Sequence, residues 1–255
     1  MSLPETKLRR IWTEDRCALN GWLAIPSTLS VEAMARAGWD SITIDMQHGT
    51  ADYAAMLAML PVIEQAGLTP MVRAPWNEPS IVMRALDAGV MGVICPMIET
   101  ADDARLFVKS CLYPPRGARS FGPIRARLVH GDTYAAEAND RVLPIAMIET
   151  RAALDNLDEI AAVDGLAALY IGPSDLASAL GYKPAFDRRE PELVTAIERI
   201  RDAATKNGIA ACIHCGTPEY AMEMAGKGFR LVTVGSDARF IEAGAKATVA
   251  AFRGA

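Results

Sequence analysis

Eight short apolar runs alternate with helical patterns along the 255 residues, and this alternation restricts the possible folds more than any other feature of the sequence. The short runs are typical of buried strands, and apolar residues at spacings of three and four between them predict helices. Strands are predicted at 19–25, 41–44, 69–72, 92–96, 143–148, 166–171, 209–214 and 231–234. Eight parallel units close most simply as a barrel, so we expect an α/β fold of the (β/α)8 TIM type, with residues 1–255 forming a single domain.

The predicted helices lie between the strands, and one more helix precedes the barrel. They cover 29–37, 51–66, 79–88, 101–110, 150–162, 191–207, 217–227 and 237–252. A short amphipathic helix at 4–16 comes first, with Leu8, Ile11 and Trp12 as its apolar contacts. A doubly wound open sheet is the alternative, but the GxGxxG motif is absent, so nothing indicates a dinucleotide site.

The composition excludes several classes of function. Hydrophobic residues make up 51% of the chain and charged residues 22%, the net charge is −5, and no basic patch stands out. Nucleic acid and anionic membranes are therefore not expected as partners. The N-terminus has no apolar signal segment and no run approaches the ~18 residues of a membrane span, so we expect a soluble cytoplasmic protein. Cys212 and Cys215 are spaced like metal ligands, but no second pair completes a site.

Two of the predicted strands, 143–148 and 166–171, are each followed by a carboxylate. Glu149 comes directly after the first strand, and Asp175 comes four residues after the second. Parallel strands with right-handed crossovers end on the same side of a sheet, so we expect the two carboxylates to converge. Two acids at one rim favour a hard divalent cation held by oxygen. The alternative is that each acid caps the helix that follows it.

The tetrapeptide Met-Ile-Glu-Thr occurs at 97–100 and again at 147–150, both times at the end of a predicted strand. The repeat alone does not say whether Glu99 or Glu149 would bind a cation. Glu149 is preferred because its strand neighbours the one that leads to Asp175.

Polar residues also follow the predicted strand 41–44, and the chemistry of TIM barrels takes place at this rim. Asp45, Gln47 and His48 lie there, and the neutral imidazole of His48 suits a general base near neutral pH. The alternative is a turn histidine that bonds the backbone. Asp87, an acid among apolar neighbours in a predicted helix, is a candidate for orienting the imidazole of His48.

Arg73, which follows the predicted strand 69–72, places a fixed cation at the same rim. It can stabilise the oxygen of a developing enolate, or it can form an ion pair with a neighbouring acid. No lysine lies within a predicted strand, which argues against Schiff-base chemistry, and no GxSxG motif occurs. The remaining chemistry is metal-assisted polarisation of a carbonyl compound, without an organic cofactor.

Residues 111–140 interrupt the alternation with prolines, glycines and four arginines. A connection of this length inside a barrel is usually functional or builds an interface. The arginines, which could attract an acidic substrate or simply be solvated, are Arg116, Arg119, Arg125 and Arg127.

Six motifs in matching order resemble the HpcH/HpaI aldolase family of metal-dependent, class II pyruvate aldolases. They are DMQHG at 45–49, PMVRAPWN at 70–77, LDAGVMGVICPM at 86–97, YPPRGARSFG at 113–122, IAMIET at 145–150 and YIGPSDLASALGY at 170–182. The resemblance runs from about residue 20 to the C-terminus and is greatest to the 4-hydroxy-2-oxoheptanedioate aldolases and their sugar-acid relatives. It implies a (β/α)8 barrel whose last helix is exchanged between subunits, in hexamers built as trimers of dimers.

The resemblance also assigns roles to individual residues. It implies a Mg²⁺, Mn²⁺ or Co²⁺ ion that is held by Glu149 and Asp175 and binds pyruvate. Arg73 contacts the oxo group as it becomes an enolate, and His48, backed by Asp87, handles the proton of the aldol hydroxyl. The remaining residues implied at the substrate are Gln47, Gly172, Pro173, Ser174 and Asp175, with the backbone N–H groups of Ser174 and Asp175 on the pyruvate carboxylate and Asp45 behind them.

Two positions depart from the family pattern. Many relatives have glutamate where Gln47 stands, and relatives that act on long diacids often have serine in place of Pro123. We therefore expect reversible retro-aldol cleavage of a 4-hydroxy-2-oxo acid to pyruvate, or a close analogue such as hydroxypyruvate, and an aldehyde. The alternatives are a carbon–carbon lyase for acyl-CoA thioesters, as in the citrate-lyase-like branch, and a non-catalytic 2-oxo acid binding protein.

Overall fold

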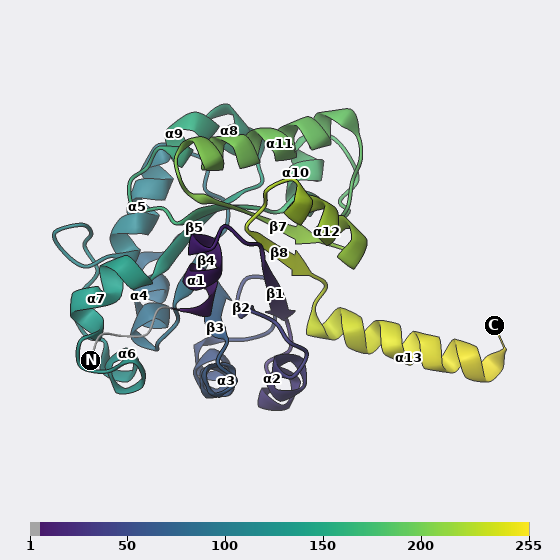
Figure 1. Cartoon of the computed structure of the whole chain (residues 1–255), viewed down its shortest axis with the longest axis horizontal. Coiled ribbons are helices and arrows are strands. Elements are labelled where there is room, and N and C mark those ends of the chain that lie inside the picture. The colour runs from purple at the N-terminus through teal and green to yellow at the C-terminus, as the bar shows by residue number, and fades with distance from the viewer. Residues whose placement is uncertain (1–5, 255) are drawn as a thin grey trace.

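A closed barrel of parallel strands forms the centre of the computed structural model, which describes residues 6–254 (Figure 1). Each strand pairs with the next, and the last pairs with the first. The strands are β1 (Ala18–Leu23), β2 (Ser41–Asp45), β3 (Thr69–Arg73), β4 (Gly92–Cys95), β5 (Leu143–Ile148), β6 (Ala168–Ile171), β7 (Ala210–Cys215) and β8 (Leu231–Val234). The predicted TIM barrel is therefore confirmed.

Helices surround the barrel and connect its strands (Figure 1). They are α1 (Lys7–Thr13), α2 (Thr28–Ala35), α3 (Tyr53–Gln65), α4 (Pro79–Asp87), α5 (Ala101–Cys111), α6 (Ile124–His130), α7 (Tyr134–Arg141), α8 (Arg151–Asp155), α9 (Leu157–Ala161), α10 (Pro173–Ala179), α11 (Pro191–Lys206), α12 (Pro218–Gly226) and α13 (Asp237–Arg253). Within residues 6–254, no helix has the length and apolar character needed to cross a membrane.

Several helices differ from the sequence-based predictions. The helix predicted at 150–162 divides at Asn156 into α8 and α9. The connection at 111–140 contains α6 and α7, and α10 was not predicted at all. The helix predicted at 4–16 covers only Lys7–Thr13, and the first two predicted positions lie outside the described residues. Thr100 and Thr150 cap their helices, and Thr100 forms a complete capping box with Asp103.

One end of the barrel is closed by α1. Its Leu8 and Ile11 are buried with the residues that fill the barrel interior, such as Met71 and Tyr170. The backbone N–H of Leu8 donates to Oγ1 of Thr69, the first residue of β3, at 3.1 Å. Because the strands begin at this closed end, the polar residues at their C-terminal ends face the other, open end.

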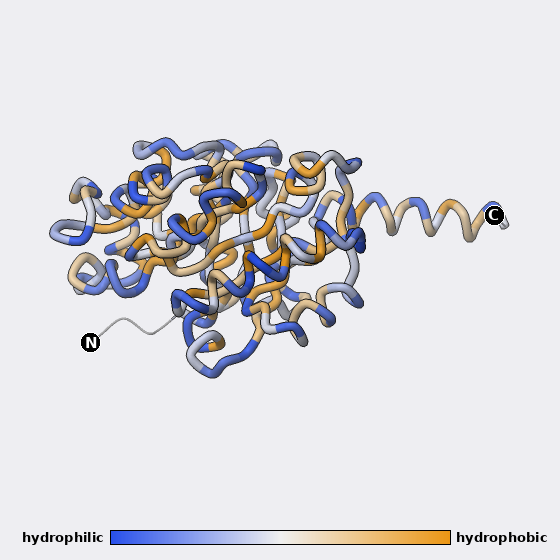
Figure 2. Tube along the Cα trace, turned by 90° about the horizontal axis from the view of Figure 1, so that it is seen from above, coloured by the Kyte–Doolittle hydropathy of each residue, from blue (hydrophilic) through white to orange (hydrophobic). Residues whose placement is uncertain are grey.

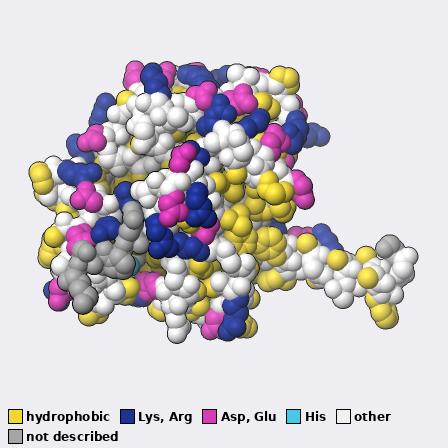
Figure 3. All heavy atoms as spheres, in the orientation of Figure 1, with side chains coloured by type: hydrophobic (Ala, Val, Ile, Leu, Met, Phe, Trp, Pro, Cys, Tyr) yellow, Lys and Arg dark blue, Asp and Glu magenta, His cyan; other side chains and the backbone are white. Residues whose placement is uncertain are grey.

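The last helix, α13, leaves the barrel instead of packing on it (Figures 1 and 2). Its apolar side chains are exposed, including Ile241 at 61% and Phe252 at 92%. Hydrophobic side chains gather on the barrel beside the start of α13 (Figure 3). There they line a groove of about 360 Å³ that includes Trp39, Met222 and Val232. Two apolar surfaces, one on α13 and one on the barrel, thus lack a partner within the described residues.

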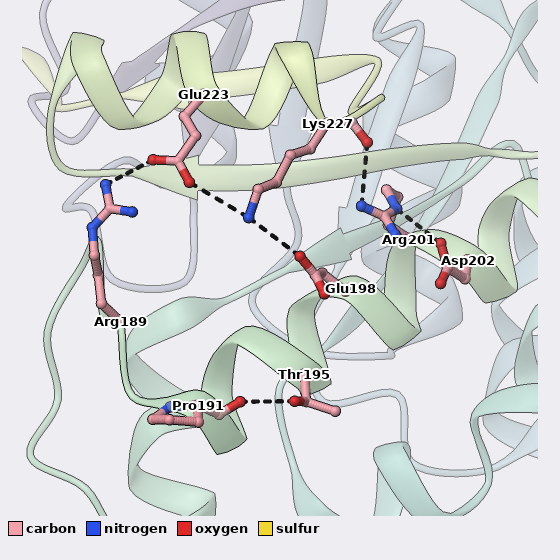
Figure 4. Close-up of polar contacts among 8 residues, drawn as sticks. All are labelled: Arg189, Pro191, Thr195, Glu198, Arg201, Asp202, Glu223 and Lys227. Atoms are coloured by element: carbon pink, nitrogen blue, oxygen red, sulfur yellow. Dashed lines mark hydrogen bonds and ion pairs between the residues drawn. The ribbon is translucent and has the colours of Figure 1, made fainter.

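Charged side chains join α11, α12 and the loop that precedes α11 (Figure 4). Arg189 of the loop donates to Glu223 of α12 at 2.7 Å, and Lys227 lies 3.4 Å from Glu223 and 3.2 Å from Glu198 of α11. Such exposed pairs contribute little to stability. The Arg189–Glu223 pair connects the loop at 181–190 to α12.

Candidate active site

A cavity of about 340 Å³ opens at the C-terminal ends of the strands. Its lining brings together most of the residues that the sequence predicts at this rim. They are Asp45, His48, Arg73, Gly172, Pro173, Ser174 and Asp175. They come from three different strand ends, so the cavity depends on closure of the barrel.

Glu149 lies against the first turn of α10. The pairing of Ile148 with Ile171 places Glu149 directly beside Gly172. A Cβ atom at position 172 would lie 2.3 Å from Glu149 Oε2, so any larger residue there would displace this carboxylate. The other oxygen, Oε1, accepts a hydrogen bond of 3.0 Å from the backbone N–H of Met97. Asp175, the third residue of α10, follows on the same turn.

Glu149 is buried, whereas Asp175 is exposed to the cavity mouth. Burial raises the pKa of Glu149 to about 7, the charge of Asp175 adds to this rise, and the N–H of Met97 and the charge of Arg73 oppose it. Within residues 6–254, Glu149 Oε2 takes part in no hydrogen bond or ion pair, so this oxygen is open to a cation or a proton. The donor set therefore fits a hard divalent ion.

Two carboxylates would be the only acidic ligands of such an ion. Within residues 6–254, no group of three or more His, Cys, Asp or Glu side chains gathers in an arrangement that could hold a metal. Mg²⁺ and Mn²⁺ sites often use one or two carboxylates and take their other ligands from water or substrate. A small oxygen-rich substrate would suit that requirement.

Asp45 and Arg73 form a two-point ion pair at the floor of the cavity. Arg73 donates from Nε to Oδ1 at 2.9 Å and from Nη2 to Oδ2 at 2.6 Å, and both side chains are buried. Burial raises the pKa of Asp45, but the hydrogen bonds and charge of Arg73, with the backbone N–H groups of Gln47 and His48, lower it by more in total. Arg73 is thus both an ion-pair partner, which was the alternative for this residue, and part of the cavity wall.

The two residues after Asp45 differ in their access to the cavity. His48 is exposed at its mouth, and its backbone N–H donates to Asp45 at 3.3 Å. Gln47 does not line the cavity, and its Oε1 is buried without a hydrogen-bond partner among the described residues. The predicted contact of Gln47 with substrate is therefore not seen in the cavity lining.

Asp87 lies at the opposite end of the barrel from His48. It is the last residue of α4, which runs back from the rim toward the start of β4 at Gly92. There its carboxylate accepts a hydrogen bond of 2.7 Å from Arg119, which also contacts Tyr134. Asp87 therefore does not orient the imidazole of His48 within one chain. A helix of the barrel ends at the face where the next strand begins, and His48 lies at the opposite face, where the strands end.

The arginines of the 111–140 connection are paired within the chain. Arg119 is fully enclosed and pairs with Asp87, and Arg125 pairs with Glu64 at 2.7 Å. Arg116 pairs with Asp140 at 2.7 Å, and Arg127 lies 3.6 Å from Asp132. None of the four lines the cavity at the rim, so within one chain they do not attract a substrate to it.

The cavity also contains residues that sequence reasoning missed. Trp22, Phe186, His214 and Arg239 form one of its walls. Burial lowers the pKa of His214 to about 3, and the charge of Arg73 lowers it further, so the imidazole is neutral near pH 7. His214 could have been found from the alternation of side chains along β7, because it lies on the same inward face of the strand as Cys212. Phe186 lies in a connection without such periodicity, and Arg239 lies in the first turn of α13, a helix whose direction the sequence pattern does not give.

Comparisons with known proteins agree with this geometry. A family model described as HpcH/HpaI aldolase/citrate lyase matches residues 20–243. The chain is 44% identical over 244 residues to a hydroxypyruvate/pyruvate aldolase of Rhizorhabdus wittichii, which covers 96% of this chain and 97% of that protein. It is 34% identical over 234 residues to a 4-hydroxy-2-oxo-heptane-1,7-dioate aldolase of Escherichia coli, covering 91% and 88%. The solved structure of an HpcH/HpaI aldolase/citrate lyase family protein from Burkholderia cenocepacia J2315 matches with a TM-score of 0.90 at 32% identity, over 98% of this chain and all of that one.

Proposed function

The chain belongs to the HpcH/HpaI aldolase/citrate lyase family and is a carbon–carbon lyase of the aldolase type, and from this premise we propose its reaction and its cofactor. The reaction is reversible cleavage of a 4-hydroxy-2-oxo acid to an aldehyde and pyruvate or hydroxypyruvate. The cofactor is a divalent cation, Mg²⁺, Mn²⁺ or Co²⁺, at Glu149 and Asp175. One observation carries the proposal: a buried acid without a cationic partner lies beside a second acid in the cavity that also holds Arg73 and His48.

The bound cation would supply positive charge that polarises the 2-oxo group and stabilises negative charge at its oxygen. The substrate carboxylate would lie at the start of α10, where the first-turn N–H groups of Ser174 and Asp175 have no partner within the helix. These donors would fix the orientation of the 2-oxo acid relative to Arg73.

Arg73 would stabilise the enolate oxygen. Its Nε and Nη2 are used by Asp45, which leaves Nη1 without a hydrogen bond to any described residue and free to donate to substrate. Since Asp45 holds the guanidinium from two points, the donor does not need to reorganise as charge develops, and this favours the transition state.

His48 would take the proton of the C4 hydroxyl group. As the O–H bond breaks, the C4–O bond becomes a carbonyl and the C3–C4 bond breaks. The electron pair of that bond enters C2–C3 and gives the enolate, whose oxygen Arg73 contacts. Protonation at C3 then releases pyruvate. The exposed position of His48 at the cavity mouth suits an exchange of this proton with water.

A pyruvate-release assay on a panel of 4-hydroxy-2-oxo acids tests the reaction and its cofactor together. We expect cleavage that EDTA abolishes and that Mg²⁺, Mn²⁺ or Co²⁺ restores. Cleavage that is unchanged by the chelator would contradict the metal assignment. Turnover of malyl-CoA in place of the free acids would instead indicate the acyl-CoA branch, and pyruvate binding without turnover would indicate a binding protein.

We also propose that α13 of a second copy covers the apolar groove beside β1 and β8. The exposed face of α13, with Ile241 and Phe252, and the groove lined by Trp39 and Val232 are both apolar and are both on the same chain. Reciprocal exchange of the helix would cover both surfaces in a symmetric dimer. Such dimers would assemble into hexamers, as the family resemblance implies.

Light scattering tests this assembly. The wild type is expected at six times the mass of one chain, and Ile241→Asp or Phe252→Asp is expected at a lower mass because each places a charge in the covered groove. Leu128→Asp is the control, since Leu128 is 77% exposed but lines neither that groove nor the pocket beside Ile241. A monomeric wild type would contradict the exchange.

A further inference from the structure

The cavity wall away from the two acids consists of three aromatic rings in contact and a guanidinium group beside the last of them. The rings of Trp22 and His214 lie 4.9 Å apart, and those of His214 and Phe186 lie 5.0 Å apart. Arg239 Cζ lies 4.5 Å from the centre of the Phe186 ring. All four residues line the cavity. An apolar surface therefore runs along this wall and leads to one positive charge.

Arg239 is held in place by the start of α13. The N-cap Ser236 accepts a hydrogen bond from the backbone N–H of Arg239 at 3.4 Å. The buried Asp237 accepts bonds from the backbone N–H of Ala24 at 2.8 Å and the hydroxyl of Ser30 at 2.7 Å. These bonds attach the first turn of α13 to the β1–α2 loop and to the first turn of α2 in the same chain, although the rest of the helix leaves the barrel.

Phe186, whose ring contacts Arg239, is also fixed in place by contacts of its loop. The neighbouring Asp187 accepts hydrogen bonds from the backbone N–H of Gly216 and the hydroxyl of Thr217, both at 2.7 Å. A Cβ atom at Gly216 would lie 2.9 Å from Phe186 Cβ, so the loop packs directly on the end of β7. Arg189 attaches the other side of this loop to Glu223 (Figure 4).

The charge of Arg239 is not neutralised by an acid. Arg239 forms no ion pair with any residue in the range 6–254, and the nearby Glu242 pairs with Lys246 instead. Arg73, the other arginine of the cavity, is neutralised by Asp45. His214 is uncharged, since burial first and the charge of Arg73 second lower its pKa to about 3. Arg239 is thus the one uncompensated cation among the cavity residues.

We propose that Arg239 binds an anionic group at the far end of the aldehyde half of the substrate. The group is a carboxylate, phosphate or sulfonate, each of which pairs well with a guanidinium. The enzyme then prefers 4-hydroxy-2-oxo acids that carry a second negative charge, and Phe186 and His214 enclose the carbon chain between the two charges. This inference depends on the proposed function, because it takes the 2-oxo acid end to lie at Glu149 and Asp175.

Non-cleavable ligands test the inference by direct binding. 2-Oxoadipate and 2-oxoheptanedioate lack the 4-hydroxyl group, and their partners 2-oxohexanoate and 2-oxoheptanoate lack only the terminal carboxylate. Calorimetry in the presence of Mn²⁺ is expected to show that at least one diacid binds more tightly than its matched monoacid. Arg239→Gln should weaken that diacid about 10- to 100-fold and leave the monoacid unchanged, and Arg239→Lys should restore part of the loss.

Arg84→Gln is the matched control, because Arg84 is also exposed, stacks on an aromatic ring (Tyr53, 3.9 Å) and makes no acidic pair among the described residues, but it does not line the cavity. It should change neither ligand's affinity. A diacid preference that persists in Arg239→Gln, or no preference in the wild type, would overturn the inference.

A turnover measurement distinguishes failure of the role given to Arg239 from failure of the proposed aldolase function. The kcat/KM for condensation of pyruvate with succinic semialdehyde or glyceraldehyde 3-phosphate is compared with that for butyraldehyde and glyceraldehyde. Active enzyme without a charge preference would leave the aldolase assignment intact and refute the role of Arg239. No condensation with any aldehyde would refute the aldolase assignment itself.

Discussion

Gly172 lies so close to Glu149 that a Cβ atom at position 172 would be 2.3 Å from Glu149 Oε2 and 2.5 Å from Met147 Cε. The contact joins the end of β5 to the start of α10, and it fixes the buried carboxylate beside Asp175. The position of the Glu149 carboxylate therefore depends on the absence of a side chain at position 172.

Gly172→Ala is expected to displace the Glu149 carboxylate and weaken divalent-cation binding about 10- to 100-fold, as the loss of a supporting contact at a metal site usually does. Calorimetric titration with Mn²⁺ measures the effect. Gly226→Ala serves as the control, because a Cβ atom there meets nothing within 4 Å. Unchanged affinity in Gly172→Ala would show that Glu149 is not a ligand.

Glu149→Ala and Asp175→Ala should each abolish metal-dependent cleavage without unfolding the barrel. Neither removes a contact from the apolar core, so circular dichroism and thermal melting should resemble those of the wild type. Glu99→Ala is the matched control, since Glu99 occupies the same tetrapeptide at the end of another strand, whereas Glu149 is the one that lies against Gly172 of the cavity lining. Full metal-dependent activity in Asp175→Ala would refute the assignment.

Arg73→Ala should lower kcat by about 10²–10³, by analogy with the loss of an oxyanion donor. Steady-state kinetics of pyruvate release shows whether the substitution changes kcat or KM. A raised KM with an unchanged kcat would make Arg73 a binding residue instead. Asp45→Asn should lower kcat by less, because the guanidinium stays but loses the partner that holds it.

The pH dependence of stability should report on His214. Its pKa is lowered from 6.5 to about 3 in the folded protein, first by burial. Below pH 6.5 the unfolded chain binds a proton at His214 that the folded chain does not. His214 therefore leaves the free energy of unfolding unchanged above this pH and lowers it as the pH drops toward 3. Between pH 8 and pH 5 the wild type should lose about 2 kcal/mol more than His214→Asn, as measured by urea unfolding. Equal losses in the two proteins would contradict the low pKa.

The sequence predicted the fold well because the signals for a barrel are local. Apolar periodicity located all eight strands to within a few residues, and helices follow Thr100 and Thr150 where the spacing of apolar residues predicts them. The helix predicted at 150–162 was wrong at Asn156, where the chain leaves helical geometry for one residue. Such short interruptions do not alter the spacing of apolar residues, so the pattern does not reveal them.

The candidate site was predictable where its residues directly follow strands. Parallel strands end at one rim, so Asp45, Arg73 and Glu149 could be placed near one another from order alone. Asp87 does not lie at the rim of its own chain, because it stands at the end of a helix and its distance from the rim depends on the direction in which that helix runs. Its partner Arg119 is 32 positions away, in a connection without periodicity.

By itself, the sequence determined the alternation of strands and helices and the carboxylates, histidine and arginine at the strand ends, because these depend on neighbours within a few positions. Only the tertiary structure decided the wall of Trp22, Phe186, His214 and Arg239, the ion pair that holds Arg73, and the departure of α13 from the barrel. These features depend on where loops from different βα units meet, and that is fixed by packing between residues far apart in the chain.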